Sequence, residues 1–326
     1  MPYIPTLQDL AAENIFTTLK INYLFEISQT SKHAYDMVLT AIPLLATHFY
    51  LKMSISSSPH VILSCDSGWE DRQRVQIEFQ RDSTSPDNSR IIKGMDFCWK
   101  TDDSNRYLCQ TLSFSTPEVL KFFQNVLELF KADLEEIHIE TDQIAHLPAI
   151  QEVELFRKSE KVTIGKGILS HEDMRRVLEG FKARNLVICC DTEPNFKLER
   201  TSSPSLEIEA DGWRPGAFLN KNLQIQMARM KKHGATETGI NMFIFQWTLS
   251  SYQGGLYLEF FKATDDSQPS KCPWGDWNIE EVTMGFASFI TRRESDDDQY
   301  SLTFQRNTDR YIMKVEFSKT SCIIYN

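Results

Sequence analysis

Helical and strand patterns alternate between Ser115 and Phe260, and this alternation restricts the fold more than any other feature of the chain. Helical patterns begin near Thr116 and near Glu237, and a capping box spans Ser170–Asp173. Short β-forming runs separate the helices, at Ile137–Ile139, Val153–Phe156, Val162–Ile164, Leu186–Cys190, Leu206–Ile208 and Leu256–Phe260. Helical connections join parallel strands, so we predict parallel strands along one side of an arc.

This alternation resembles an irregular leucine-rich-repeat array, in which a strand and its connection recur along the chain. In this sequence the interval is about 25–35 residues. The repeat is poorly preserved, so the sequence predicts a short α/β arc rather than a regular solenoid. The tail from Val282 to Tyr325 returns to strand patterns, which the acidic run Glu294–Asp298 interrupts.

The segment before this alternation is rich in β-forming residues. Five runs, separated by polar loop sequences, lie at Leu51–Ile55, Val61–Ser64, Val75–Phe79, Ile91–Trp99 and Tyr107–Phe114. Short consecutive strands with polar loops are typical of antiparallel sheets. We therefore predict an antiparallel β segment over residues 46–115.

The first 45 residues have a helical pattern. Thr6–Asp9 is a capping box, and apolar residues follow it at three- and four-residue spacing. Ser31 can cap a third helix, which Pro43 should end. Three short helices make a unit of about 40 residues, which is too small to be stable alone and needs a neighbour or a partner.

Composition and charge exclude several classes of function. The net charge is −10, which argues against nucleic acid or an anionic membrane as partner. The seven cysteines are widely spaced without a C-x-x-C pair, which indicates reduced thiols in the cytoplasm or nucleus. No signal peptide pattern opens the chain, and the most apolar stretch, Met37–Phe49, is too short to span a bilayer.

No motif in the sequence predicts catalysis, a metal or a cofactor. Gly165–Gly167 lacks the first glycine and the final hydroxyl of a phosphate loop, and the vicinal Cys189 and Cys190 end an apolar strand, where buried inert thiols are the usual case. An unrecognised enzyme site around His138, Asp142 and His146 is the alternative, which base rates disfavour. We predict a protein without catalytic residues.

Two tryptophans lie in a loop-like stretch. Trp274 and Trp277 belong to the segment Lys271–Asn278. An exposed tryptophan in a loop is a typical anchor of a protein interface, but tryptophan is also buried on average and could fold back over an apolar edge. Both residues are therefore candidates for contact with a target protein.

The N-terminal motif resembles an F-box. The hydrophobic–proline pair that opens the F-box is matched by Ile4 and Pro5, and the leucine-serine element ending in S-K by Leu24 to Lys32. Tyr35 stands near the place where F-boxes often carry tryptophan. The resemblance implies docking to a ligase adaptor through the apolar face and its opening proline, namely Ile4, Pro5, Leu7, Leu10, Ile15, Phe16 and Leu24.

The C-terminal part resembles the F-box-associated (type 2) domain of the large nematode F-box families. Asp211–Trp213 matches its D-W element, and Thr236–Phe261 matches the block in which a helix with Asn and Phe ends in Trp before a strand. Phe289–Phe317 resembles the final strands, although Ser295–Asp298 replaces the usual Asp-Gly turn.

The resemblance implies a substrate-recognition subunit of an SCF-type cullin-RING ubiquitin ligase. The expected organisation is an F-box at 1–45, a β-rich linker at 46–115 and a substrate-recognition domain at 116–326. The partners implied are the ligase adaptor, through it the cullin, and a target protein. The alternative is a non-ligase interaction scaffold with a degenerate F-box.

Overall fold

A computed structural model describes residues 19–45, 48–65, 73–81, 89–92, 95–101, 106–111, 116–193, 196, 201–209, 226–235, 237–262, 277–295, 299–318 and 321–326. The chain divides into two compact units, Met1–Glu160 and Lys161–Asn326.

The described helices at the start of the first unit pack their apolar sides inward. They are α2 (Ile21–Ser28), α3 (Lys32–Ala41) and the 3-10 helix η1 (Ile42–Leu44). Ser31 caps α3, with its Oγ 3.0 Å from the amide of Ala34, and Pro43 lies in the 3-10 turn that ends the helix. Both predicted helix signals are therefore confirmed.

The sheet of the first unit is mixed. Its strands, in spatial order, are β4 (Ser89–Ile92), β5 (Met95–Thr101), β6 (Arg106–Thr111), β3 (Gln73–Arg81), β2 (His60–Cys65), β1 (Phe49–Ile55) and β7 (Asp133–Ile139). Strand β2 pairs with β1 and β3 in antiparallel orientation, and β5 pairs with β4 and β6 in the same way. The β3–β6 and β1–β7 pairs are parallel, so the prediction of a purely antiparallel segment is wrong.

Helix α4 (Thr116–Phe130) supplies the aromatic core of this unit. Phe122 lies 5.3 Å, centroid to centroid, from Phe79 of β3 and 6.4 Å from Phe25 of α2. At the other end of α4, Phe130 lies 5.4 Å from Phe49 of β1. The helix thus joins the N-terminal helices to the sheet through edge-to-face and tilted ring contacts.

Short helices follow β7. They are η2 (Thr141–His146), α5 (Leu147–Glu152) and α6 (Glu154–Arg157). The predicted strand at Val153–Phe156 is wrong, because the amides of Phe156 and Arg157 bond to the carbonyl of Val153 and close a helical turn. A short apolar run cannot be assigned to strand or helix by its pattern alone.

The domain boundary predicted at residue 116 also differs from the structure. Strand β7 pairs with β1 in parallel, and contacts group all residues up to Glu160 in one unit. The segment 116–160 therefore completes the β-rich sheet instead of beginning the C-terminal unit. Sequence-local patterns do not show this, because the pairing joins strands far apart in the chain.

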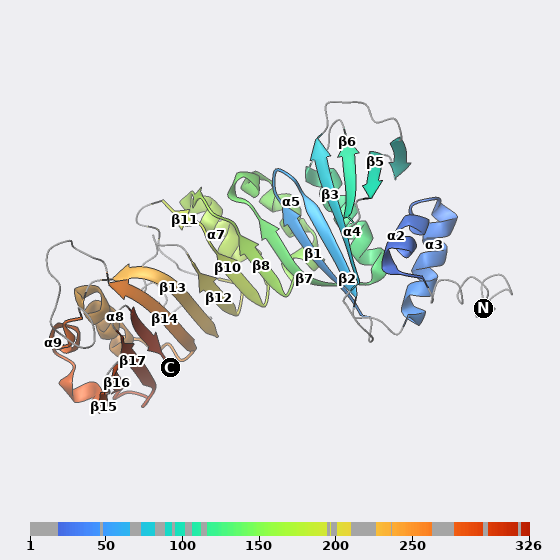
Figure 1. The fold of residues 1–326 in the computed structure, drawn as a ribbon. Helices are drawn as coiled ribbons and strands as arrows, with labels where there is room; N and C mark the ends of the chain where they lie inside the picture. Colours follow the sequence, from blue (N-terminus) through green and yellow to red (C-terminus); the bar gives the residue numbers. More distant parts are fainter. Residues whose placement is uncertain are drawn as a thin grey trace. The chain divides into compact units, whose positions relative to one another are not determined.

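The second unit begins with a parallel ladder. Strands β8 (Lys161–Ile164), β10 (Asn185–Ile188), β12 (Ser205–Ile208), β13 (Met227–Ala235) and β14 (Gly255–Lys262) pair in this order, and every pair is parallel (Figure 1). Ile164, Ile188, Ile208 and Leu258 lie in one row of the ladder and are fully buried. The predicted parallel strands are confirmed for β8, β10, β12 and β14, whereas β13 was not predicted.

Helix α7 (His171–Gly180) connects β8 to β10, and the two-stranded pair β9 (Ile168–Leu169) and β11 (Asp191–Thr192) flanks it. The predicted capping box is formed: Ser170 Oγ accepts from the amide of Asp173 at 3.1 Å and donates to its carboxylate at 2.7 Å. The cap satisfies an amide that the helix itself leaves unpaired.

An antiparallel sheet completes the second unit. Strand β14 pairs with β18 (Ser321–Tyr325), and β17 (Ile312–Phe317), β16 (Tyr300–Gln305) and β15 (Ile290–Ser295) follow outward. Buried residues alternate with more exposed ones along β17 and β18, so these strands have one apolar face. The outermost strand, β15, is exposed or half-buried along its length. Helices α8 (Glu237–Leu249) and α9 (Ile279–Thr283) and the 3-10 helix η4 (Ala287–Phe289) belong to the same region (Figure 1).

The structure confirms the coarse prediction of a mixed helix-and-strand fold. The described residues form N-terminal helices, a seven-stranded mixed sheet and a C-terminal five-stranded antiparallel sheet. Among the described helices, none has the length and apolar character needed to cross a bilayer.

Candidate protein-binding surface

Helix α8 is apolar on both of its sides. Its inner side is buried and consists of Ile240, Phe243, Ile244 and Trp247. On its outer side, Met242 is 50% exposed, Phe245 46% and Leu249 65%. A surface helix normally carries polar residues on its outer side. An exposed row of large apolar side chains is instead typical of an interaction surface.

The end of α9 extends this row. Asn241 Nδ2 donates to the carbonyls of Val282 at 2.9 Å and Met284 at 3.2 Å, which fixes the end of α9 beside α8. The Met284 side chain is 69% exposed. We call Met242, Phe245, Leu249 and Met284 the α8 outer stripe. The three helical members are spaced by three and four residues, so they lie on one side of the helix.

The N-terminal end of α8 is held by the segment that carries Trp277. Trp277 is 2% exposed, and its ring lies 6.1 Å from that of Phe317 in β17. The next residue, Asn278, donates its amide to Glu237 Oε1 at 3.1 Å and caps α9 with its own side chain. Trp277 thus covers the apolar face of the sheet, and Asn278 fixes the start of both helices.

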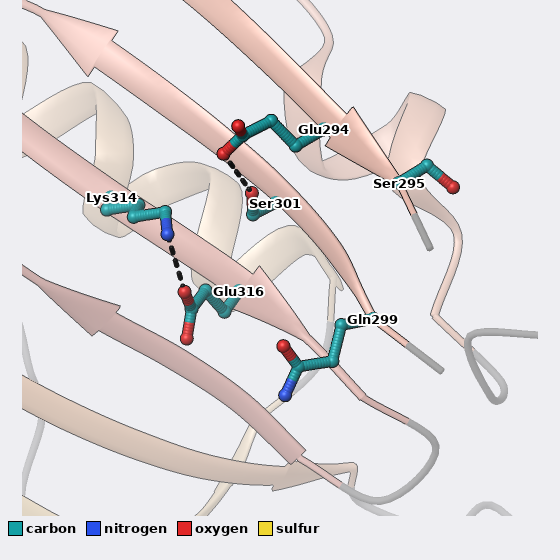
Figure 2. Close-up of a pocket in the computed structure, with 6 residues that line it drawn as sticks. All are labelled: Glu294, Ser295, Gln299, Ser301, Lys314 and Glu316. Atoms are coloured by element: carbon teal, nitrogen blue, oxygen red, sulfur yellow. Dashed lines mark hydrogen bonds and ion pairs between the residues drawn. The ribbon is translucent and has the colours of Figure 1, made fainter. Parts of the chain in front are cut away.

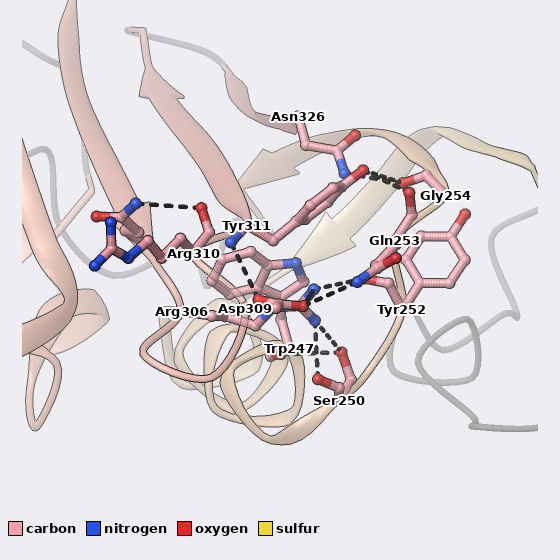
Figure 3. Close-up of polar contacts among 11 residues, drawn as sticks. Trp247, Ser250, Tyr252, Gln253, Gly254, Arg306, Asp309, Arg310, Tyr311 and Asn326 are labelled. Carbon is pink, nitrogen blue, oxygen red and sulfur yellow. Dashed lines mark hydrogen bonds and ion pairs between the residues drawn. The ribbon is translucent and has the colours of Figure 1, made fainter.

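The C-terminal end of α8 is held by a fully buried arginine (Figure 3). Arg306 Nη1 donates to the carbonyl of Ser250 at 2.9 Å, and Nη2 donates to the carbonyl of Tyr252 at 2.8 Å. Its guanidinium stacks over Trp247 at 4.9 Å and pairs with Asp309 at 2.7 Å. The arginine satisfies carbonyls that follow the end of the helix, so the outer stripe stands on a rigid support.

Asp309 makes this contact sensitive to acid. The backbone amide of Tyr311, with Gln253 and Arg306 in addition, holds the pKa of the Asp309 carboxyl below its usual range. A carboxyl group whose pKa is lower in the folded than in the unfolded state stabilises the fold at any pH above its unfolded pKa of about 4. This stabilisation is lost as the pH falls through the pKa of the folded state.

We therefore expect Asp309→Asn to reduce the loss of stability on acidification. Urea midpoints of wild type and variant, measured between about pH 2 and about pH 6, should converge toward the acid end. A constant difference across the whole range would contradict the role of the carboxylate. Asp133→Asn, at the exposed start of β7, is the control.

The opposite, polar face of the antiparallel sheet carries a hollow of about 280 Å³ (Figure 2). Its polar groups pair with one another: Lys314 Nζ lies 2.8 Å from Glu316 Oε1, and Ser301 Oγ donates to Glu294 Oε2 at 3.5 Å. Ser295 and Gln299 complete the lining. We assign no ligand to this hollow, because its charged groups already have partners within the sheet.

The predicted target-binding tryptophans are corrected in part. Trp277 is not an exposed anchor but a buried cover of the sheet, and its apolar surroundings are the physical reason. Trp274 lies outside the described residues. The sequence did not predict the outer stripe. Helix α8 has apolar residues on both sides, and only packing decides which side faces inward.

The predicted adaptor-binding residues fall into two groups. Leu24 is 1% exposed, in contact with the first unit's own core, so it is not available to a partner as predicted. Its neighbours Ile21 and Phe25 are buried as well, and Phe25 packs on Phe122. The remaining candidates lie outside the described residues: Ile4, Pro5, Leu7, Leu10, Ile15 and Phe16.

The other chemical candidates lack the features of a reactive site. Burial raises the pKa of the Cys189 thiol to about 11 and that of Cys190 to about 12. Such thiols are protonated at neutral pH and poor nucleophiles. Within the described part of the chain, which includes His138, Asp142 and His146, no group of three or more His, Cys, Asp or Glu side chains could hold a metal ion.

No protein-family model, curated protein or solved structure matches the chain.

Proposed function

We propose that this chain is the substrate-recognition subunit of an SCF-type cullin-RING ubiquitin ligase. In this proposal the F-box-like segment docks the ligase adaptor, and the second unit captures a target protein. The supporting observation is the α8 outer stripe, a row of exposed apolar side chains on a helix whose start is bonded to Asn278 and whose end is held by the buried Arg306. Exposed apolar surface of this kind favours protein binding over small-molecule chemistry.

The parallel ladder β8–β14 fits the same proposal. Its strands all pair in parallel, with a register shift in β13 between Met230 and His233. This pairing fits an irregular leucine-rich-repeat-like arc, and such arrays serve as platforms for protein recognition. The proposed mechanism is scaffolding. A target held by this chain meets the ubiquitin carrier of the ligase at a raised effective concentration, and no residue of the chain performs the transfer.

The buried N-terminal helices favour a second candidate, a scaffold that does not assemble with a ligase. Ile21, Leu24 and Phe25 are buried, and Phe25 packs on Phe122 of α4. The described helices therefore offer little apolar surface to an adaptor, and docking would depend on residues 4–16.

Co-purification with the adaptor separates the two candidates. We expect the purified chain to bind the adaptor, and Pro5→Ala with Leu10→Ala to abolish binding, because a helix-on-helix interface depends on a few apolar anchors. A matched control is Pro43→Ala with Leu155→Ala, since Pro43 is exposed and Leu155 is 50% exposed. Unchanged binding by the first variant, or none by the wild type, would favour the non-ligase scaffold.

A further inference from the structure

The outer stripe on α8 has an acidic border at one end. Glu280 and Glu281 lie in the first turn of α9, and Glu237 lies in the first turn of α8. Two of these carboxylates are fixed: Thr238 Oγ1 donates to Glu281 Oε1 at 2.9 Å, and the amide of Asn278 donates to Glu237 Oε1 at 3.1 Å. All three carboxylates thus lie on the first turns of α8 and α9, which Asn241 joins.

The start of α9 accounts for only part of the negative charge of Glu280 and Glu281. Carboxylates in a first turn are stabilised by the helix dipole, but a helix N-terminus carries only about half a positive charge. The start of α9 therefore offsets about half of one of these two carboxylate charges. The border of the stripe remains acidic, and it attracts a cationic partner.

We propose that the outer stripe binds a short, basic, amphipathic helical segment of the target protein. This inference rests on the proposed role of the chain as a target receptor and names the chemical class of what it captures. A helix that lays an apolar row against a second helix recognises it through residues spaced by three and four, as in the stripe itself. Lysines or arginines at one end of that segment would face Glu280 and Glu281.

The stripe fits a short segment better than a second copy of this chain. Four partly exposed side chains form a patch well below the roughly 800 Å² per partner of a standard interface. Two copies would also bring together chains of net charge −10 each, which opposes self-association.

The test uses two fluorescent helical peptides of about four turns with the same leucine pattern. One has lysine and the other has glutamate at the polar positions. Fluorescence anisotropy with the full chain should show binding of the lysine peptide only. Phe245→Ser with Leu249→Ser should weaken that binding about tenfold or more.

Two further variants separate the stripe from general charge attraction. Ile168→Ser with Ile312→Ser removes apolar side chains that are 72% and 52% exposed elsewhere in the same unit, and binding should not change. Glu280→Gln with Glu281→Gln should weaken binding about threefold or more at about 0.05 M salt and very little at about 0.5 M salt. The proposal would be overturned if both peptides bound equally well. It would also be overturned if the Ile168 and Ile312 control weakened peptide binding as much as the stripe variant, or if light scattering showed that the chain self-associates through the stripe.

This result is independent of the adaptor experiment. Peptide binding without adaptor binding would contradict the ligase role and leave the recognition of a basic helix standing. Adaptor binding without selective peptide binding would contradict only the recognition inference.

Discussion

Arg306→Met should destabilise the second unit by about 2–4 kcal/mol, because the buried carbonyls of Ser250 and Tyr252 would lose their donor. Each buried polar group without a partner costs about 1–3 kcal/mol. Asp309 would also lose its ion pair with Arg306. This residue is exposed and water can solvate its carboxylate, so the expected free-energy change includes only the two carbonyls. Urea unfolding followed by tryptophan fluorescence, with Trp247 directly beneath the guanidinium, measures the change.

Two other variants define what the arginine contributes. Arg306→Lys should recover part of the stability, since one ammonium group cannot reach both carbonyls and the carboxylate in the way a planar guanidinium does. Arg310→Met, at an exposed position of the same turn, should have an effect within about 0.5 kcal/mol. If Arg306→Met and Arg310→Met were equally stable, the support of α8 by Arg306 would be refuted.

Trp277→Ala should destabilise the second unit by about 3–5 kcal/mol, the usual cost of removing a buried tryptophan. The ring is 2% exposed and packs on Phe317, so its loss would open a cavity over the sheet. Trp277→Phe should lose less, because the smaller ring still fills part of the space. Thermal and urea unfolding of the purified chain measure both effects.

An exposed aromatic residue of the same region is the control for this change. Phe245 is 46% exposed, so Phe245→Ala should cost about 1 kcal/mol or less in stability while weakening the binding of the lysine peptide. Trp277→Phe should show the reverse, reduced stability with normal binding. If Trp277→Ala left stability unchanged and abolished binding, Trp277 would be an anchor for the partner and not a cover of the sheet.

Local signals in the sequence predicted much of the secondary structure correctly. Ser31 and Ser170 cap the helices that follow them, and α8 spans Glu237–Leu249 where its pattern indicated. These features depend on hydrogen bonds and apolar spacing within a few positions along the chain, so one short segment contains the necessary information.

Pairing and burial were predicted less well. The parallel β1–β7 pair, which assigns residues 116–160 to the first unit, and the helical turn at α6 both differ from the prediction. Leu24 and Trp277 were predicted to face partners and are buried. The β1–β7 pair and the burial of Leu24 and Trp277 depend on segments that are distant in sequence, and a periodic pattern does not identify the segment that will cover a residue. The turn at α6 is local and was missed because a short apolar run fits a strand as well as a helix.

The sequence by itself predicted where α3, α4, α7 and α8 begin and which runs become four of the five strands of the parallel ladder. Only the tertiary structure decided which side of α8 stays open and what holds it. Arg306 reaches the carbonyl of Ser250 across 56 positions of sequence, and Asn241 reaches that of Val282 across 41. The physical reason is range: helix caps and helical turns form between neighbours in the chain, whereas exposure depends on contacts that exist only after distant segments have packed together.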